Sequence, residues 1–255
     1  MNIQKSNKFD MSGIKQIIYS LILCAMAINT YAQDASAVDK INTSAGDVEM
    51  YFIGHGSLMF IVNGFCIHVD PVRSSGSYNN LPKADLILVT HEHYDHLDAK
   101  LIADLRKQET VMLCNQKSAS EIKWAQAMNA GESRSVGIIG VETVPAYNIV
   151  NMRSPGQPFH PKGTGIGFVL AIGGKKIYIA GDTENTPEMK ALKNIDIAFL
   201  PMNLPYTMTP EMAADAARAF KPKILYPYHY GDTKADKLTA LLKGTDIEVR
   251  IRNLK

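Results

Sequence analysis

The segment Thr90-His91-Glu92-His93-Tyr94-Asp95-His96-Leu97-Asp98 carries the pattern His-x-His-x-Asp-His. It follows an apolar run over 84–90, which is typical of a strand buried on both faces of a sheet. It precedes 98–107, where apolar residues recur at helical spacing. The polar side chains of the pattern therefore lie in a short loop at the carboxyl end of a buried strand, where α/β proteins commonly place their chemistry.

The residues of this loop are of the types that bind metal ions. His91 and His93 project to the same side of an extended chain, so two imidazoles can hold one ion. Asp95 and His96 follow the turn and can face a second ion. A solvated polar loop is the alternative, but the strong strand and helix patterns on either side disfavour it.

The rest of the chain alternates β-hairpins with strand–helix units, and this order occurs twice. Asn63-Gly64 and Gly173-Gly174 supply the positive φ angles of tight hairpin turns, and an irregular stretch, 145–165, separates the two halves. We predict strands over 50–53, 58–62, 65–69, 84–90, 136–144, 166–172, 175–180, 196–201, 224–227 and 247–251, and helices over 98–107, 118–129, 210–220 and 235–242. This order predicts an α/β fold with two sheets packed face to face and helices outside.

The first 32 residues have the features of a secretory signal peptide. Three lysines precede an apolar run over 17–28, and Thr30-Tyr31-Ala32 has small residues where a signal peptidase cleaves. The run is shorter than the roughly 18 residues that a membrane span needs. Bulky residues before Cys24 disfavour a lipoprotein. We expect cleavage near Ala32, a periplasmic or secreted location, and no stable membrane span afterwards.

After the signal peptide, the small and polar residues 33–46 predict a linker, so that 47–255 form a single domain. The 255 residues contain 27 Lys+Arg and 25 Asp+Glu, a net charge of +2. Removal of the signal peptide takes away three Lys and one Asp and balances the charge. A balanced chain has no general attraction for nucleic acid, so we expect a small-molecule substrate. The sequence leaves open the oligomeric state and whether Cys66 and Cys114 pair.

The central segment resembles the His-x-His-x-Asp-His signature of the metallo-β-lactamase fold superfamily. Further segments resemble that superfamily's later motifs in the same order: 53–57, 69–71, 180–183 and 227–231. The resemblance covers most of 48–252 and is closest to the branch of ascorbate-6-phosphate lactonase-like proteins and the phospholipase D that hydrolyses N-acyl-phosphatidylethanolamine. It implies a four-layer αββα sandwich and a metal-dependent hydrolase.

The resemblance also implies a ligand set. His91 and His93 would hold the first ion, Asp95 and His96 the second, Asp182 would bridge both ions, and His229 would complete the second site. Many relatives carry another histidine, for the first ion, at the position of Asn148. We expect His160 to replace it, and a first site completed by Asn148 and water is the alternative.

Other residues have secondary predicted roles. His55, in a Gly-His-Gly turn, is expected either beside the site or bound to the backbone to hold the turn. Asp70 resembles an aspartate that orients a metal-binding histidine, and a simple Asp-Pro turn is the alternative. Tyr206 is a candidate for a hydrogen bond to substrate. His68 has no motif around it and is expected to be structural. Three cationic residues are candidates to meet an anionic group of the substrate: Arg73, Arg153 and Lys162.

The resulting hypothesis is a hydrolase with two divalent metal ions, in which Asp95 accepts the proton of the attacking water. The imidazole ligands favour zinc, with manganese or iron as alternatives. The expected bond is ester-like: a lactone, a phosphodiester or an amide. The competing hypotheses are a non-catalytic metal-binding protein on the same fold and a β-lactam amide hydrolase. Redox chemistry is disfavoured because oxygen-reducing relatives have Glu at the position of His93.

Overall fold

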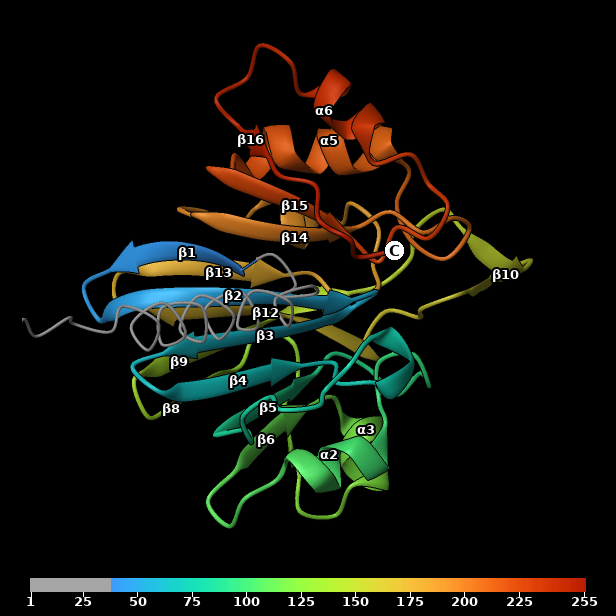
Figure 1. Cartoon of the computed structure of the whole chain (residues 1–255). Helices are drawn as coiled ribbons and strands as arrows, with labels where there is room; N and C mark the ends of the chain where they lie inside the picture. The colour runs from blue at the N-terminus through green and yellow to red at the C-terminus, as the bar shows by residue number, and fades with distance from the viewer. Residues whose placement is uncertain (1–37) are drawn as a thin grey trace, which may run out of the picture. The chain divides into compact units, whose positions relative to one another are not determined.

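The computed structural model describes residues 38–255, which belong to one compact unit (Figure 1). The predicted signal peptide, 1–32, and the first part of the predicted linker, 33–37, lie outside the described residues. No helix within 38–255 has the length and apolar character needed to cross a bilayer.

The first sheet has seven strands in the order β1-β2-β3-β4-β5-β6-β7. Their bounds are β1 Val38–Thr43, β2 Gly46–Gly54, β3 Ser57–Val62, β4 Phe65–Val69, β5 Leu86–Val89, β6 Val111–Cys114 and β7 Gln126–Ala127. The hairpin-connected strands β1 to β4 pair antiparallel, whereas β4 to β7 pair parallel.

The second sheet also has seven strands, in the order β16-β15-β14-β13-β12-β9-β8. Their bounds are β8 Ser133–Val136, β9 Ile139–Ala146, β12 Gly165–Ile172, β13 Lys175–Ile179, β14 Ile197–Pro201, β15 Ile224–Tyr228 and β16 Glu248–Val249. β8, β9, β12 and β13 pair antiparallel, and β13 to β16 pair parallel. A small separate hairpin consists of β10 Met152–Ser154 and β11 Gln157–Pro158.

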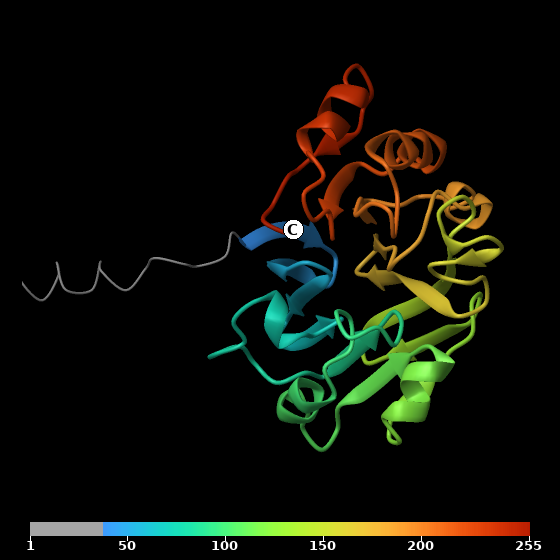
Figure 2. The same cartoon turned by 90° about the vertical axis from the view of Figure 1, so that its right-hand side faces the viewer.

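The two sheets pack face to face, with helices outside both (Figures 1 and 2). Aromatic side chains join the sheets: the ring centroids of Phe52 and Tyr226 are 5.2 Å apart, and those of Phe60 and Phe199 are 6.0 Å apart. The helices are α2 Ala99–Leu105 and α3 Gln116–Glu121 beside the first sheet, and α4 Pro187–Lys190, α5 Pro210–Phe220 and α6 Asp236–Leu241 beside the second. The predicted αββα sandwich is confirmed.

Short-range signals placed most elements correctly. Asp98 caps α2 by accepting a hydrogen bond from the Leu101 amide, and Thr209 caps α5 in the same way, with Pro210 at the first helical position. The Asn63-Gly64 turn joins β3 to β4 as expected. In each case the residues that decide the structure are neighbours in the sequence.

The helix predicted over 118–129 is wrong in most of its length. α3 ends at Glu121, and the chain then extends to form β7, which pairs parallel with Leu113 and Cys114 of β6. The exposed backbone edge of β6 offers hydrogen bonds to this segment, and pairing there covers an edge that would otherwise be open. The Arg106 guanidinium lies over the Trp124 side chain, with its central carbon 4.2 Å from the centroid of the Trp124 ring. This contact helps to hold the segment in place.

Two other boundaries differ from the prediction. The single strand predicted over 136–144 is a hairpin of β8 and β9, because Gly137 adopts a φ of +57° and starts a turn. The predicted irregular stretch 145–165 contains the β10–β11 hairpin. Cys66 and Cys114 are both free and buried, and burial raises the pKa of each thiol to about 12.

The linker predicted over 33–46 is wrong from Val38 onward, because 38–43 form strand β1. This strand lacks an apolar pattern and is held by its pairing with β2 and by Asp39. Asp39 accepts hydrogen bonds from the Arg252 guanidinium at 2.6 and 2.8 Å and from the Tyr226 hydroxyl at 2.5 Å. The first strand is therefore fastened by residues from the far end of the chain.

Replacing Asp39 with asparagine is expected to destabilise the fold by about 1.5–3 kcal/mol at pH 7, the usual worth of hydrogen bonds to a charged group. Burial opposes ionisation of Asp39, but the bonds from Arg252 and Tyr226 outweigh it and lower its pKa. Because the pKa of Asp39 is lower in the folded protein than in the unfolded chain, the ionised side chain stabilises the fold at pH values above the ordinary carboxyl range. This contribution is lost as the pH falls through the folded-state pKa. Urea unfolding at pH 7 and at about pH 3 measures the difference. The control is Glu49→Gln, which changes a more exposed carboxylate on β2 and should change stability less. An equal loss of stability from Asp39→Asn at both pH values would contradict the prediction.

Candidate metal centre

The predicted ligands meet at the carboxyl ends of the central strands, toward the end of the molecule that faces the viewer in Figure 2. The loop 91–98 follows β5, Asp182 follows β13, and His229 follows β15 directly. His160 comes from the loop between β11 and β12. Because parallel strands end at the same edge of a sheet, residues far apart in sequence converge here.

Asp182 lies at the centre of the cluster. Its Oδ2 is 3.4 Å from His160 Nε2 and 3.9 Å from His91 Nε2. Its Oδ1 is 3.4 Å from both His96 Nε2 and His229 Nε2. The two oxygens of one buried carboxylate thus face two different pairs of imidazoles.

Each side of Asp182 has a further ligand from the central loop. On the first side, His93 Nδ1 is 3.1 Å from His91 Nε2, and candidate ligand atoms of His91, His93 and His160 all lie within 4.8 Å of one another. On the second side, Asp95 Oδ2 is 3.6 Å from His229 Nε2 and 3.9 Å from His96 Nε2. The seven predicted ligands form one cluster with two halves.

Two of the histidines, His91 and His96, are oriented from behind by hydrogen bonds to Nδ1. Asp70 Oδ2 accepts from His96 Nδ1 at 2.8 Å, the contact predicted for this aspartate, and from the Thr90 hydroxyl at 2.7 Å. Because the Thr90 hydroxyl donates to Asp70, its oxygen accepts from His91 Nδ1 at 3.0 Å. With Nδ1 protonated, the Nε2 lone pairs of His91 and His96 point into the cluster, as metal ligands require.

Asn148 orients His160 instead of lining the cluster itself. Its Oδ1 accepts hydrogen bonds from His160 Nδ1 at 2.7 Å and from the His160 amide at 2.9 Å. Its Nδ2 donates to Glu184 Oε1 at 3.1 Å and to the Tyr206 carbonyl at 2.9 Å. These bonds use all the polar atoms of the side chain, so the geometry favours His160 over Asn148 with water as the third residue of the first half.

Glu184 is a buried carboxylate that the sequence prediction missed. It accepts hydrogen bonds from the backbone amides of Ile149, Val150 and Asn151 at 2.6–2.7 Å, in addition to the bond from Asn148. It therefore shapes the loop that carries Asn148. Its position two residues after Asp182 is the only sequence signal that pointed to it.

Several buried atoms of the cluster have no hydrogen-bond partner. Three of them face the second half of the cluster, namely His96 Nε2, Asp182 Oδ1 and His229 Nε2, and a fourth is His229 Nδ1. Buried polar atoms without partners are rare because each costs free energy. A cation at this point would satisfy all three at once, and imidazole and carboxylate are suitable ligands for it. The residues present therefore fit a metal centre.

The electrostatics of the cluster also suit cations. Burial opposes the charge of Asp182, but His229 and the other imidazoles lower its pKa well below the usual carboxyl range. Burial and the neighbouring charge of His96 lower the pKa of His91. Burial lowers the pKa of His96, but Asp182 and Asp70 outweigh it and raise the pKa to about 9, so a metal ion would bind His96 in exchange for its Nε2 proton. The carboxylates stay ionised and attract positive charge into a buried site.

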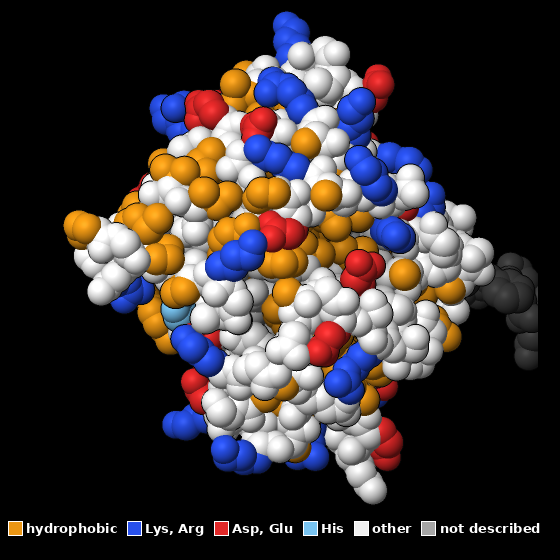
Figure 3. Space-filling model, turned by 180° about the vertical axis from the view of Figure 1, so that it is seen from behind, with side chains coloured by type: hydrophobic (Ala, Val, Ile, Leu, Met, Phe, Trp, Pro, Cys, Tyr) orange, Lys and Arg blue, Asp and Glu red, His pale blue; other side chains and the backbone are white. Residues whose placement is uncertain are grey.

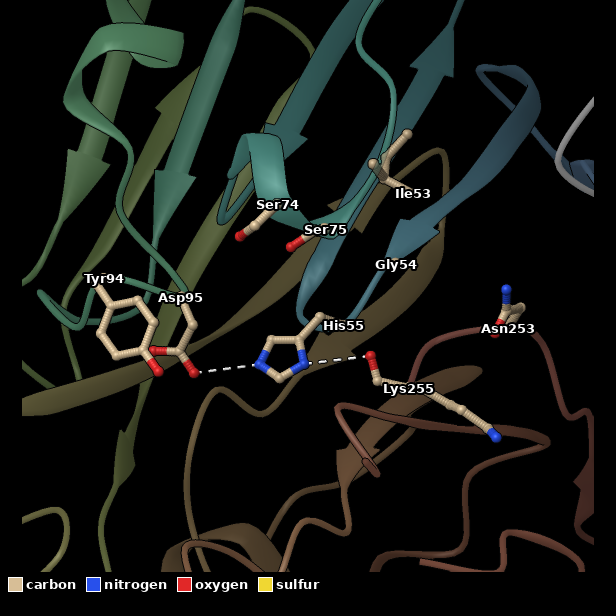
Figure 4. A pocket seen from close by; sticks show the side chains of 9 residues that line it. All are labelled: Ile53, Gly54, His55, Ser74, Ser75, Tyr94, Asp95, Asn253 and Lys255. Carbon is tan, nitrogen blue, oxygen red and sulfur yellow. Dashed lines mark hydrogen bonds and ion pairs between the residues drawn. The ribbon is translucent and has the colours of Figure 1, made fainter. Parts of the chain in front are cut away.

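His55 lies between Asp95 and Lys255, as Figure 4 shows. Its Nε2 is 3.2 Å from Asp95 Oδ2, and its Nδ1 is 3.2 Å from the main-chain oxygen of Lys255. Its ring lies 3.7 Å from the His229 ring, centroid to centroid. The expectation that His55 sits beside the site agrees with this position, which borders a cavity of about 440 Å³ that Ser74 and Ser75 also line.

Backbone strain is concentrated around the cluster. Three residues here have positive φ angles, which residues other than glycine rarely adopt: His55 at +51°, Asp70 at +43° and His229 at +45°. Gly56 allows the turn after His55 to approach closely, because a Cβ there would lie 3.0 Å from His96 Cε1. The surrounding packing holds these conformations and so fixes the positions of the candidate ligands.

The other predicted residues lie outside the cluster. His68 is buried and bonded to the Pro82 carbonyl at 3.0 Å, a structural position. Tyr206 is 45% exposed and lines the mouth of the cluster with Arg153. The Arg73 guanidinium is bound by Asp98 and the Lys162 ammonium by Glu188, at 2.9 and 2.8 Å.

Replacing Asn148 with alanine is expected to weaken metal binding in the first half of the cluster by about 10- to 100-fold, the usual cost of losing an orienting partner. The second half should keep its affinity because Asp70 and His96 are untouched. Zinc titration of the metal-free protein by calorimetry, with two binding constants fitted, measures the change. Asn151→Ala, in the same loop but without a histidine contact, is the matched control. Equal weakening of both constants, or of neither, would contradict an orienting role.

Comparison with known proteins agrees with this geometry. A family model described as a beta-lactamase superfamily domain matches residues 49–229. The chain belongs to this superfamily. The membership predicted from the His-x-His-x-Asp-His segment is confirmed, and the solved structures that match share the metallo-β-lactamase fold.

Relatives of this superfamily member cover nearly its whole described length. A UPF0173 metal-dependent hydrolase of Pelotomaculum thermopropionicum is 31% identical over 221 residues, which cover 80% of this chain and 96% of the relative. A candidate metal-dependent hydrolase of Parabacteroides distasonis is 47% identical, with a TM-score of 0.82 over 86% of this chain and all of that one. Igni18, a metallo hydrolase of Ignicoccus hospitalis, shares the fold at 23% identity and a TM-score of 0.68. The chain is a metal-dependent hydrolase of the metallo-β-lactamase superfamily.

Proposed function

We propose that this hydrolase is exported, binds two zinc ions and cleaves an ester-like bond in a small molecule. The observation that carries the proposal is the central position of Asp182, whose two oxygens face two separate groups of ligands. The first group is His91, His93 and His160, and the second is Asp95, His96 and His229, with His55 beside them. A carboxylate between two such groups suits a pair of ions.

Zinc is proposed because imidazole dominates the ligand set and no thiolate takes part. When bound, two such ions supply a nucleophilic water near neutral pH and neutralise charge that develops on the oxygen of the substrate. Manganese and iron are the alternatives that metal analysis would distinguish. The seven candidate ligand residues would hold the ions, and Asp70, Thr90 and Asn148 orient three of the imidazoles.

Asp95 is the proposed proton acceptor. Its side chain is 28% exposed, whereas that of Asp182 is 4% exposed, so Asp95 reaches the cavity from which water enters. Burial opposes the charge of Asp95, but the contact with His55 and the nearby imidazoles of His229 and His96 outweigh it and lower its pKa, which maintains the carboxylate. His55 contacts Asp95 Oδ2, the same oxygen that faces His229, at 3.2 Å and so helps to hold Asp95 in place.

The cavity above the cluster supports a small-molecule substrate. It has a volume of about 610 Å³ and is lined by polar ligand residues together with Tyr206, Phe159 and Arg153. The resemblance to lactonase-like and phospholipase D-like proteins favours a lactone or a phosphodiester. A β-lactam is the amide alternative, since one fold supports several chemistries.

Export is proposed from the sequence of residues 1–32 alone. Sequencing the amino terminus of the protein recovered from the culture medium or the periplasm tests it, and a start at Gln33 is expected. A protein that keeps Lys5 and Lys8 in the mature form would contradict cleavage near Ala32.

The central experiment combines metal analysis with a substrate panel. The purified protein is analysed for metal content, then tested with chromogenic phosphodiesters, lactones and β-lactams before and after chelation. Two zinc ions per chain and hydrolysis that chelation abolishes would support the proposal. Two bound ions without turnover of any substrate would favour a metal-binding protein, and one ion or none would contradict the dinuclear site.

A further inference from the structure

Arg153 differs from the other cationic residues near the metal centre. Among residues 38–255 its guanidinium has no hydrogen bond to another side chain and no carboxylate within ion-pair distance. Arg73 is bound by Asp98 and Asp104, and Lys162 by Glu188. A cation without a partner beside a binding cavity is free to pair with a ligand.

The position of Arg153 connects it to the reaction site. It lies on β10, in the hairpin beside the metal centre, and lines two cavities, of about 490 and 610 Å³. His93 and His160 line both of these cavities as well. A molecule in either cavity can therefore contact both Arg153 and the first group of candidate metal ligands.

Aromatic side chains extend from Arg153 along the mouth. The guanidinium carbon lies 5.7 Å from the centre of the Phe159 ring, and this ring meets Tyr206 edge to face, with centroids 5.1 Å apart. A guanidinium over an aromatic face is held in place without losing its hydrogen-bond donors. In the view from behind, hydrophobic side chains and Lys or Arg side chains gather on the side of the molecule where a histidine is visible (Figure 3).

The nearby cation Lys117 does not serve the same purpose. Its ammonium group is 2.7 Å from Glu92 Oε1, and Glu92 also accepts a hydrogen bond from Asn115 at 2.9 Å. The charge of Lys117 is therefore compensated within the chain. Arg153 is the uncompensated cation among the residues that line these two cavities.

We propose that Arg153, supported by Phe159, binds a carboxylate or phosphate group that the substrate carries in addition to the bond that is hydrolysed. This inference rests on the proposed hydrolase function and adds the class of substrate. The planar fork of the guanidinium matches two oxygens of such a group. The anionic group lies on the Arg153 side of the mouth, and the hydrolysable bond extends from it toward Asp182.

The turnover test uses two esters with the same leaving group and the same number of acyl carbons. 4-Nitrophenyl butyrate is neutral, and mono-4-nitrophenyl succinate carries a carboxylate. The zinc-loaded wild type should prefer the succinate ester, and Arg153→Ala should lower kcat/KM for that ester about 10- to 100-fold, mainly through KM. Arg153→Lys should restore part of the preference because it keeps the charge without the fork. Lys162→Ala, which removes a cation already paired with Glu188, should keep the wild-type preference.

A binding test separates this proposal from the proposed function. Calorimetry measures the affinity of benzoate and of phenylphosphonate for the zinc-loaded wild type and for Arg153→Ala. A loss of about tenfold or more in the variant supports the anion site, and the ligand with the larger loss identifies carboxylate or phosphate as its partner. If neither ester is hydrolysed, the ester chemistry fails while the binding result still decides the role of Arg153. Equal affinities in wild type and variant for both anions, or no binding to either protein, would overturn the inference.

Discussion

Replacing Asp182 with asparagine is expected to reduce the metal content from two ions per chain to at most one and to lower turnover by about 10³-fold or more, the range seen when a central catalytic residue is removed. Asp182 is the residue whose oxygens lie 3.4–3.9 Å from four imidazoles, two on each side. An amide has nearly the same size but no charge, and it offers one acceptor oxygen in place of two. Metal analysis by mass spectrometry and hydrolysis of the best substrate measure the two effects.

The control for this prediction is Asp232→Asn, a change of the same chemistry at an exposed position without side-chain partners among the described residues. It should keep both ions and full turnover. Circular dichroism should show that Asp182→Asn keeps the native secondary structure, because the backbone pairing of β13 does not depend on this side chain. A folded Asp182→Asn protein that retains two tightly bound ions would disprove the central position assigned to Asp182.

Replacing Asp95 with asparagine should lower kcat by about 10²- to 10⁴-fold, the usual contribution of a general acid–base residue. The amide can still offer an oxygen toward the second half of the cluster, but it cannot accept a proton. The ligands His96, His229 and Asp182 are unchanged, so we expect metal content to fall less than turnover does. The separation of these two readouts distinguishes a proton acceptor from a residue that only binds metal.

The matched control is Asp98→Asn, three residues later in the same loop. Asparagine is as good a helix cap as aspartate, so α2 should begin at the same residue. This variant should keep wild-type metal content and turnover. If Asp95→Asn lost both ions and all turnover together, Asp95 would be essential as a ligand and its role as proton acceptor would lack support. If it kept full kcat, the proposed mechanism would be wrong.

Local sequence information was sufficient to predict the central loop, two helix caps and one tight turn. His91, His93, Asp95 and His96 are neighbours in one loop, so their proximity follows from the covalent chain and from the strand and helix on either side. The caps of α2 and α5 and the tight turn at Asn63-Gly64 were predicted for the same reason. The resemblance to a known superfamily then supplied the partners Asp182 and His229, which the structure brings to the same cluster.

Features that depend on long-range contacts were missed or left open. β1 and β7 carry no strand pattern of their own and form because a neighbouring backbone edge and distant side chains hold them. Glu184 was overlooked because a buried carboxylate becomes visible only when the amides around it are known. The conformation and environment of such residues depend on packing between segments that are far apart in sequence.

By itself, the sequence determined the sandwich of two sheets, the loop with four metal ligands and the family, because periodicity and motif spacing act over a few residues at a time. Only the tertiary structure favours His160 over Asn148: hydrogen bonds occupy the polar atoms of the Asn148 side chain, and one of them orients His160 toward Asp182. It also selected Arg153 from three cations by showing that the other two are already paired. Both choices depend on which loops meet in space, and that is set by the packing of the two sheets.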